Sequence, residues 1–244
     1  MPPDDKIMSR PVDKAGEGSA GTLASSVYDR LRSDILSGAL PPDEKLRTEA
    51  LRARYGVGNS PIREALNRLS ADRLVTREDQ KGFRVATASR ADLEELVKTR
   101  CWLEEIALRE SIKNGGDDWE ETVVLQFHRL SRVPRSSNQE QFESNPEWDK
   151  RHRAFHMSLL SACGSRWLLQ YCTQLSDQAK RYRQLALVVS YPRRNELSEH
   201  EAIMKAATGR DADTAARLLL AHYNRTANII KDAIPEFGDG TESA

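Results

Sequence analysis

The stretch between residues 56 and 85 decides how the N-terminal part of the chain folds. Residues 56–69 read GVGNSPIREALNRL, and residues 79–85 read DQKGFRV. Ser60 is predicted to cap a helix, because its hydroxyl accepts an otherwise unpaired backbone N–H, and the fixed φ of Pro61 suits the first helical position. Four apolar residues then share one face at helical spacing, namely Ile62, Ala65, Leu66 and Leu69. The pattern predicts a helix with one buried face.

The opposite face of this helix is polar, basic and almost free of acidic residues. Upstream, residues 48–55 form a short predicted helix, and the two glycines in the turn at residues 56–58 permit a tight reversal. This is the pattern of a helix-turn-helix, whose second helix enters the DNA major groove with its N-terminal residues leading. We expect Arg63 to be the main base or phosphate reader. The other residues expected to contact DNA in this unit are Arg47, Thr48, Asn59, Ser60, Pro61 and Asn67.

Two short segments downstream alternate apolar and polar residues. Residues 75–77 and 83–85 flank a turn at residues 79–82, which predicts a two-stranded hairpin, or wing. Lys81 is expected to meet a phosphate at the wing tip, and Gly82 lets the backbone come close to DNA. The alternative is a small helical subdomain whose basic face is simply solvated.

Charge is distributed unevenly along the chain, although 37 basic residues balance 37 acidic residues overall. Residues 21–90 carry 13 lysines and arginines against 9 acidic residues, whereas residues 91–244 carry 21 against 24. The basic excess coincides with the predicted DNA reader, as phosphate binding requires. The charge of the whole chain says nothing about its partners.

Length and pattern predict two domains, because 244 residues exceed the roughly 100 to 200 typical of one domain. A first helix is expected at residues 23–37, with Leu23, Val27, Leu31 and Ile35 on one face. After the wing, every strong pattern is helical. We expect helices near residues 90–113, 118–132, 146–163, 166–190, 195–208 and 212–233.

The expected fold is therefore mainly α. An N-terminal winged helix-turn-helix of three helices and a two-stranded wing precedes a C-terminal all-α helical bundle that is long enough to enclose a pocket. The expected divisions are a disordered tail at residues 1–21, a DNA-binding domain at 22–88, an effector-binding and dimerisation bundle at 89–235 and a flexible tail at 236–244.

Three cysteines, Cys101, Cys163 and Cys172, lie in apolar helical patterns without paired spacing, which favours reduced thiols in a cytoplasm. The chain has no apolar run near the roughly 18 residues of a membrane span, and its first 21 residues lack the apolar core of a signal peptide. We expect a cytoplasmic protein without a membrane partner.

Four of the five histidines lie on apolar faces of the predicted bundle helices: His152, His156, His200 and His222. Asp149 lies on the same stripe as the first two. Buried imidazoles that converge from three helices can share a divalent metal ion, with zinc expected and nickel or manganese as alternatives. Each histidine taken singly also fits a core or helix-capping role. His128, alone on its helix, is expected at the surface or between helices.

These motifs resemble the GntR family of winged-helix regulators. The N-terminal match lies at residues 56–57, 61–66 and 81–85. The later helices resemble the ligand-binding bundle of the FadR subfamily, of the FCD type, through residues 100–104, 155–156, 199–201 and 221–222. The resemblance covers almost everything after residue 21. It implies double-stranded operator DNA, a small carboxylate effector and a homodimer.

Within this family, four segments are most similar to those of a glutarate-responsive repressor: residues 115–120, 147–152, 162–165 and 181–183. Two positions depart from the family pattern. Many members have an arginine where this chain has Asn59, so operator preference does not transfer. Many FCD domains supply a metal-binding aspartate four residues before His156, where this chain has His152. The expected fourth ligand is thus His152 or, as the alternative, Asp149.

A carboxylate effector inside a bundle must be paired with positive charge. Arg100 shares a helix face with apolar residues and is expected to point inward, either toward the effector or into an ion pair with Glu104. Further effector-binding candidates on one apolar helix are Gln178, Arg181 and Tyr182. Arg183 is expected to face outward.

The sequence thus predicts a homodimeric DNA-binding transcription regulator, a repressor controlled by a small carboxylic or dicarboxylic acid near a metal. The alternative is a metal-dependent enzyme built on the histidines, since catalytic metal sites also keep open positions. No nucleophile or general base is placed beside the histidines in the sequence, and catalysis would leave the DNA reader unexplained.

Overall fold

The computed structural model describes residues 18–138, 143–190 and 195–233. The expected C-terminal tail, and the expected N-terminal tail up to residue 17, lie outside the described residues. Two compact units emerge from the contacts. Of the described residues, one unit comprises those up to residue 33 together with 45–84, and the other comprises residues 34–44 and those from residue 85 onward.

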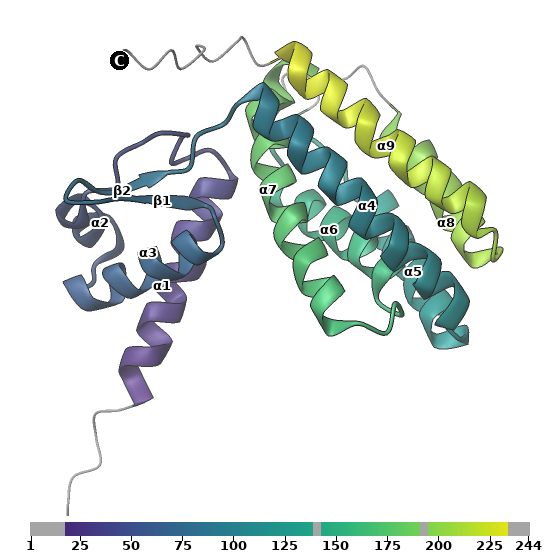
Figure 1. The fold of residues 1–244 in the computed structure, drawn as a ribbon, viewed down its shortest axis with the longest axis horizontal. Helices are drawn as coiled ribbons and strands as arrows, with labels where there is room; N and C mark the ends of the chain where they lie inside the picture. The colour runs from purple at the N-terminus through teal and green to yellow at the C-terminus, as the bar shows by residue number, and fades with distance from the viewer. Residues whose placement is uncertain (1–17, 139–142, 191–194, 234–244) are drawn as a thin grey trace, which may run out of the picture. The chain divides into compact units, whose positions relative to one another are not determined.

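The first unit is the predicted winged helix-turn-helix (Figure 1). Its elements are α1 (Gly18–Leu36, which continues into the second unit), α2 (Thr48–Tyr55), α3 (Asn59–Ala71), β1 (Val75–Glu78) and β2 (Gly82–Val85). The two strands pair as an antiparallel wing. Gly56 ends α2 at a φ of 68°, in the left-handed region that favours glycine, and its N–H donates to the carbonyl of Arg52. This residue makes the tight turn between α2 and α3.

Three local expectations in this unit are wrong. Helix α3 begins at Asn59 and is preceded by Gly58 without a side-chain cap, so Ser60 is not the N-cap. Pro61 is tolerated because the N–H groups of a first helical turn have no intrahelical partner in any case. Helix α1 begins at Gly18, inside the expected tail, and Leu23 is 42% exposed because Ala24 takes the buried position.

The second unit is a bundle of long helices. They are α4 (Arg90–Asn114), α5 (Asp117–Ser131), α6 (Pro146–Leu160), α7 (Arg166–Ser190), α8 (Glu196–Thr208) and α9 (Ala212–Ala233). Helix α4 packs against α7 and α9, and α5 packs against α6 and α8. Figure 1 shows α4 and α9 side by side. Helix α6 ends three residues earlier than expected, because the chain turns at Ser161 and Gly164 has a φ of 76°.

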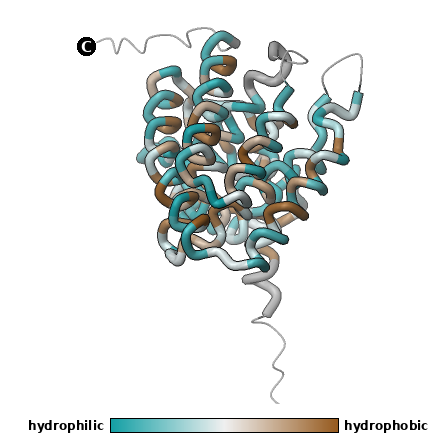
Figure 2. Tube along the Cα trace, turned by 90° about the vertical axis from the view of Figure 1, so that its right-hand side faces the viewer, coloured by the Kyte–Doolittle hydropathy of each residue, from teal (hydrophilic) through white to brown (hydrophobic). Residues whose placement is uncertain are grey.

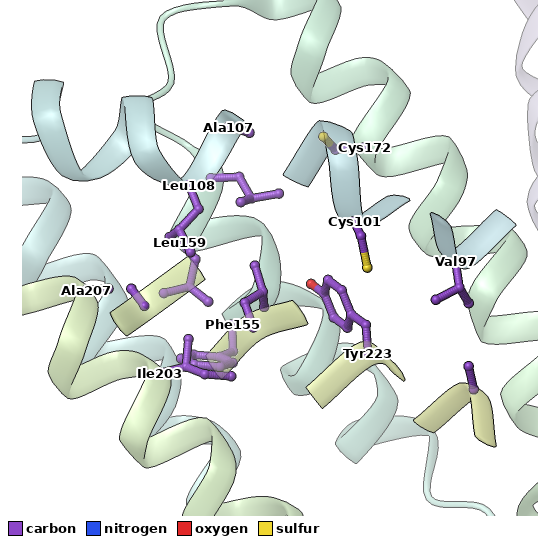
Figure 3. Close-up of a cluster of buried hydrophobic side chains, with 14 of the residues drawn as sticks. Val97, Cys101, Ala107, Leu108, Phe155, Leu159, Cys172, Ile203, Ala207 and Tyr223 are labelled. Carbon is purple, nitrogen blue, oxygen red and sulfur yellow. The ribbon is translucent and has the colours of Figure 1, made fainter. Parts of the chain in front are cut away.

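The core of the bundle is apolar and continuous. Hydrophobic positions recur along each helix between hydrophilic ones (Figure 2), as a one-sided buried face requires. Phe155, Leu159 and Ile203 are fully buried together with Leu108, and Tyr223 extends the cluster (Figure 3). None of the described helices combines the length and the hydropathy that a membrane span needs. The core surrounds four buried histidines, which come from α6, α8 and α9.

Candidate functional site

Helix α3 presents the predicted DNA readers to the outside. Arg63 is exposed, as are Asn59, Ser60 and Asn67, while Pro61 is half-buried. Their outward direction follows from the burial of Ile62, Ala65, Leu66 and Leu69 on the other face. Before α2, Arg47 is exposed and Thr48 is half-buried.

The wing tip lies between β1 and β2. Lys81 and Gly82 are both exposed there, and the N–H of Lys81 donates to the carbonyl of Glu78. Gly82 has a φ of 96°, which a residue with a β-carbon rarely adopts. The tip therefore places the exposed cation of Lys81 on a tight turn.

Four histidines converge inside the bundle, from α6, α8 and α9. His152 and His156 lie one turn apart on α6, and they meet His200 of α8 and His222 of α9. Their ligand nitrogens all lie within 4.8 Å of one another, and all four side chains are buried. The Nε2 atom of His156 is 3.2 Å from Nε2 of both His152 and His200.

A chain of hydrogen bonds orients His156. The hydroxyl of Tyr223 donates its single proton to Glu104, so its oxygen accepts from Nδ1 of His156, at 3.1 Å. Arg100 holds the same carboxylate from the other side, with 2.6 Å between Arg100 Nε and Glu104 Oε1. Because Nδ1 carries the proton, the lone pair of His156 Nε2 points into the cluster.

Glu199 orients His222 in the same way, since Nδ1 of His222 donates to Glu199 Oε2 at 2.9 Å. His152 differs from these two histidines. Its Nδ1 faces Nη1 of Arg183 at 3.4 Å. A guanidinium group has no acceptor, so Nδ1 of His152 holds the lone pair in this arrangement.

The cluster fits a divalent metal ion. Metal–nitrogen bonds of about 2.0 to 2.1 Å place neighbouring ligand atoms roughly 3.0 to 3.4 Å apart, which matches the spacing of 3.2 Å around His156 Nε2. Burial lowers the pKa of both His152 and His156 well below its ordinary value, with further contributions from Arg183 and the neighbouring imidazoles. Neutral imidazoles are the form that binds a metal.

Asp149 points away from the histidines. Its carboxylate accepts from Gln184 Nε2 at 2.7 Å, and it pairs with Lys180 at 3.2 Å and with Arg183 at 3.3 Å. All three partners lie on α7. The structure therefore brings the four histidines together and uses Asp149 to join α6 to α7.

A cavity of about 30 Å³ lies beside the histidines. His152 and His222 line it, together with Arg100 and Arg183. Arg100 thus lines the cavity as well as pairing with Glu104, and its guanidinium carbon lies 3.8 Å from the centre of the Tyr223 ring. The apolar lining includes Leu93 and Val97 of α4, Ala227 and Ile230 of α9, and Ala179 of α7.

The expectation that Arg183 faces outward is wrong. Its side chain is 14% exposed, contacts His152 and Asp149 and lines the cavity. Helical periodicity gives the angles between the side chains of Arg181, Tyr182 and Arg183 around α7. Which of the three side chains contacts α6 depends on how α6 and α7 pack. That packing is a non-local contact, which periodicity does not encode.

The other α7 candidates lie elsewhere. Arg181 donates to the carbonyls of Ala86, at 2.8 Å, and Thr87, at 3.0 Å. The Tyr182 hydroxyl donates to Asp92 and accepts from the N–H of Ser89. Both side chains hold the segment that leads into α4 and do not reach the histidines. Gln178 is half-buried on α7, outside the lining of this cavity.

Comparison with known families decides the class of the protein. Residues 23–85 match the family described as "Bacterial regulatory proteins, gntR family", and residues 95–225 match the FCD domain. The chain belongs to the GntR family. This GntR-family protein is a DNA-binding transcriptional regulator with a C-terminal FCD domain, and not the metal-dependent enzyme considered as the alternative.

Individual relatives agree with this assignment. The regulator is 38% identical over 216 residues to the HTH-type transcriptional repressor GlaR of Escherichia coli strain K12, across 85% of this chain and 95% of that protein. It is 36% identical over 210 residues to the uncharacterized HTH-type transcriptional regulator BphR of Paraburkholderia xenovorans strain LB400, across 86% of each.

A solved structure shares the fold. The E. coli protein McbR/YncC superposes with a TM-score of 0.71 at 20% sequence identity, covering 86% of this chain and 97% of that one. At this identity the similarity concerns the fold alone.

Proposed function

We propose that this GntR-family regulator is a repressor whose operator binding is controlled by a small carboxylate or dicarboxylate bound beside a metal in the bundle. The observation that carries the proposal is the position of Arg100 and Arg183 in one cavity with His152 and His222. A metal ion held by neutral imidazoles keeps its positive charge, and a cationic buried site needs an anion.

The metal would be held by His156, His200 and His222, with His152 as the fourth ligand once its ring proton moves from Nε2 to Nδ1, so that the Nε2 lone pair faces the cluster. Nitrogen ligands suit zinc, and nickel is compatible with them, whereas manganese prefers oxygen ligands. When bound, the ion supplies a Lewis-acidic position for one carboxylate. Arg100 and Arg183 would orient the rest of the effector.

The size of the cavity supports control by a change of conformation. A volume of about 30 Å³ accommodates one or two water molecules, so a five-carbon diacid requires α4, α7 and α9 to move apart. A ligand that binds only the expanded bundle shifts the protein toward that state. Glutarate is the leading effector because of the sequence resemblance to a glutarate-responsive repressor, and the relative in E. coli is itself named a repressor.

In this proposal, residues 22–88 form the DNA-binding domain and residues 89–235 form the effector-binding and dimerisation domain. Helix-turn-helix proteins bind two half-sites one helical turn apart, which a homodimer with two reader helices matches. The regulator works in the cytoplasm, where operator DNA is accessible.

The experiment is a titration of operator DNA, selected from random duplexes, with and without glutarate. We expect glutarate to weaken operator binding at least fivefold, the lower end of typical allosteric coupling. Calorimetry should detect glutarate binding that weakens after metal removal and in Arg183→Gln, while the distant His128→Asn leaves it unchanged. Glutarate and its homologues binding nowhere at millimolar concentration would refute the effector class. Binding without any change in operator affinity would refute the coupling.

A further inference from the structure

Four consecutive residues of α7 hold two different parts of the bundle. Arg183 and Gln184 bond to Asp149 of α6, and Arg183 also contacts His152. Arg181 and Tyr182 bond to the segment at residues 86–92. Successive residues of an α-helix point about 100° apart. One turn of α7 therefore contacts both the surroundings of the histidine cluster and the chain that enters α4.

The contacts with residues 86–92 are buried and directional. Arg181 is 4% exposed and donates to two consecutive carbonyls, those of Ala86 and Thr87. Tyr182 is fully buried, and its hydroxyl bonds to Asp92 and to the N–H of Ser89 at 3.3 Å. Ser89 is also the N-cap of α4 and accepts from the N–H of Asp92 at 3.1 Å. Tyr182 thus hydrogen-bonds to both Ser89 and Asp92, the two residues that form the cap.

These contacts fall on the connection between the two domains. Strand β2 ends at Val85 and α4 begins at Arg90, so residues 86–89 are all that separates the wing from the bundle along the chain. Hydrogen bonds to two carbonyls and one N–H in so short a segment restrict the backbone of the chain where it enters α4. A free segment of this length would sample many directions.

We propose that Arg181 and Tyr182 form a linker lock, by which the state of the metal-proximal cavity controls the segment at residues 86–92. This inference rests on the proposed function. An effector carboxylate that draws Arg183 away from Asp149 displaces the α7 turn that carries the lock. The displacement loosens the bonds to Ala86, Thr87 and Ser89, so the segment that joins the DNA-binding domain to α4 gains conformational freedom. Arg181 and Tyr182 are positioning residues for the linker, and they do not contact the effector.

The test uses Tyr182→Phe in the full-length protein, because this change removes the hydroxyl and keeps the buried ring. Tyr171→Phe is the matched control, since Tyr171 lies on the same helix and is 52% exposed. Arg181→Lys is the second variant and keeps the charge while losing the paired bonds to two carbonyls. Three quantities are measured: glutarate affinity without DNA, operator affinity with and without glutarate, and hydrogen exchange of the amides at residues 86–92.

In Tyr182→Phe we expect glutarate to bind at least as tightly as in the wild type and up to about tenfold more tightly, because the effector no longer has to break this hydrogen bond. The ratio of operator affinities with and without glutarate should fall from at least fivefold to below about twofold. The Ser89 amide should exchange at least tenfold faster, because its only acceptor in the described structure is the Tyr182 oxygen. Arg181→Lys should behave in the same direction, and Tyr171→Phe should match the wild type in all three.

The alternatives give different results. Weaker glutarate binding with intact coupling would place Tyr182 in the effector site and overturn the lock. Unchanged exchange at residues 86–92 in both variants would overturn the lock even if glutarate still controls the operator. If the operator affinity of the wild-type protein does not change when glutarate is bound, the proposed function is refuted, and with it the regulatory role of the lock.

Discussion

Among single residues, His152 and Asp149 have separate roles although they share one helix face. We predict that the purified protein carries about one divalent ion per chain, as expected for a single four-ligand site. His156→Ala should abolish metal binding, and His152→Ala should weaken it less, because His152 must first move its ring proton to Nδ1, which faces the Arg183 guanidinium. Asp149→Asn should keep the metal, since that carboxylate faces α7. Elemental analysis of the three variants checks this, and loss of metal in Asp149→Asn alone would reverse the assignment.

The buried histidines also make stability depend on pH. In the metal-free protein, burial lowers the pKa of His152 and His156, so the unfolded chain binds more protons than the folded one just below the ordinary histidine pKa of about 6.5. The free energy of unfolding should therefore be highest above about pH 6.5 and should decrease as the pH falls below that value. The expected slope is about 1.4 kcal/mol per pH unit for each imidazole kept neutral. Urea unfolding of chelator-treated protein between pH 7.5 and 5.5 measures it, with His128→Asn as the control.

Arg63 carries the prediction for DNA reading. Arg63→Ala should leave the fold intact, because the side chain is exposed, and weaken specific operator binding by about 1 to 3 kcal/mol. Lys81→Ala should weaken binding evenly across sequences and lower the salt slope by about one. Arg217→Ala, an exposed change on α9, is the control for lost charge. Unchanged operator affinity in folded Arg63→Ala would remove that residue from the interface.

At the scale of elements, α4 contains a buried ion pair whose removal should be costly. Arg100 and Glu104 are 10% and 2% exposed in their side chains and lie 2.6 Å apart. Arg100→Ala leaves an uncompensated buried carboxylate, so we expect a loss of about 3 to 5 kcal/mol of unfolding free energy. The double variant Arg100→Leu/Glu104→Leu should recover most of it. Denaturant unfolding of both variants is the measurement, and equal losses in the two would show that the pair is not coupled.

The helices and their ends differ in how well the sequence predicts them. Bundle helices such as α4 and α9 were predictable to within a residue or two, because apolar periodicity and glycine or proline breaks are local signals. The start of α3 was not, because Ser60 and Gly58 both suit a cap and tertiary packing selects between them.

The site divides in a similar way. The convergence of the four histidines could be predicted, because each lies on an apolar helix face and such faces point into the core of the bundle. The orientations of Asp149 and Arg183 did not follow, because they depend on α6 packing against α7. Glu199 and Tyr223, which hydrogen-bond to the ring nitrogens of His222 and His156, could not be predicted for the same reason. Residues that meet across helices are set by contacts far apart in the sequence.

At the scale of the whole molecule, metal, effector and operator are linked through one protein. If the metal favours effector binding, then the effector must raise metal affinity by the same factor, and operator DNA must lower affinity for the effector that releases it. We predict that stripping the metal reduces the response of operator binding to glutarate and leaves operator affinity without glutarate within about threefold. Chelation followed by zinc addition in the same titration tests this. A full response in the stripped protein would remove the metal from the mechanism.

The small volume of the cavity beside the histidines has a consequence for the rate of effector binding as well as for its affinity. Helices of a packed bundle separate by collective motions in the range of microseconds to milliseconds or slower, and a ligand that waits for such an opening associates below the usual range of about 10⁵ to 10⁷ M⁻¹s⁻¹. The association rate should then level off at high glutarate concentration. A regulator built this way filters out only those effector fluctuations that are shorter than the opening time of the bundle.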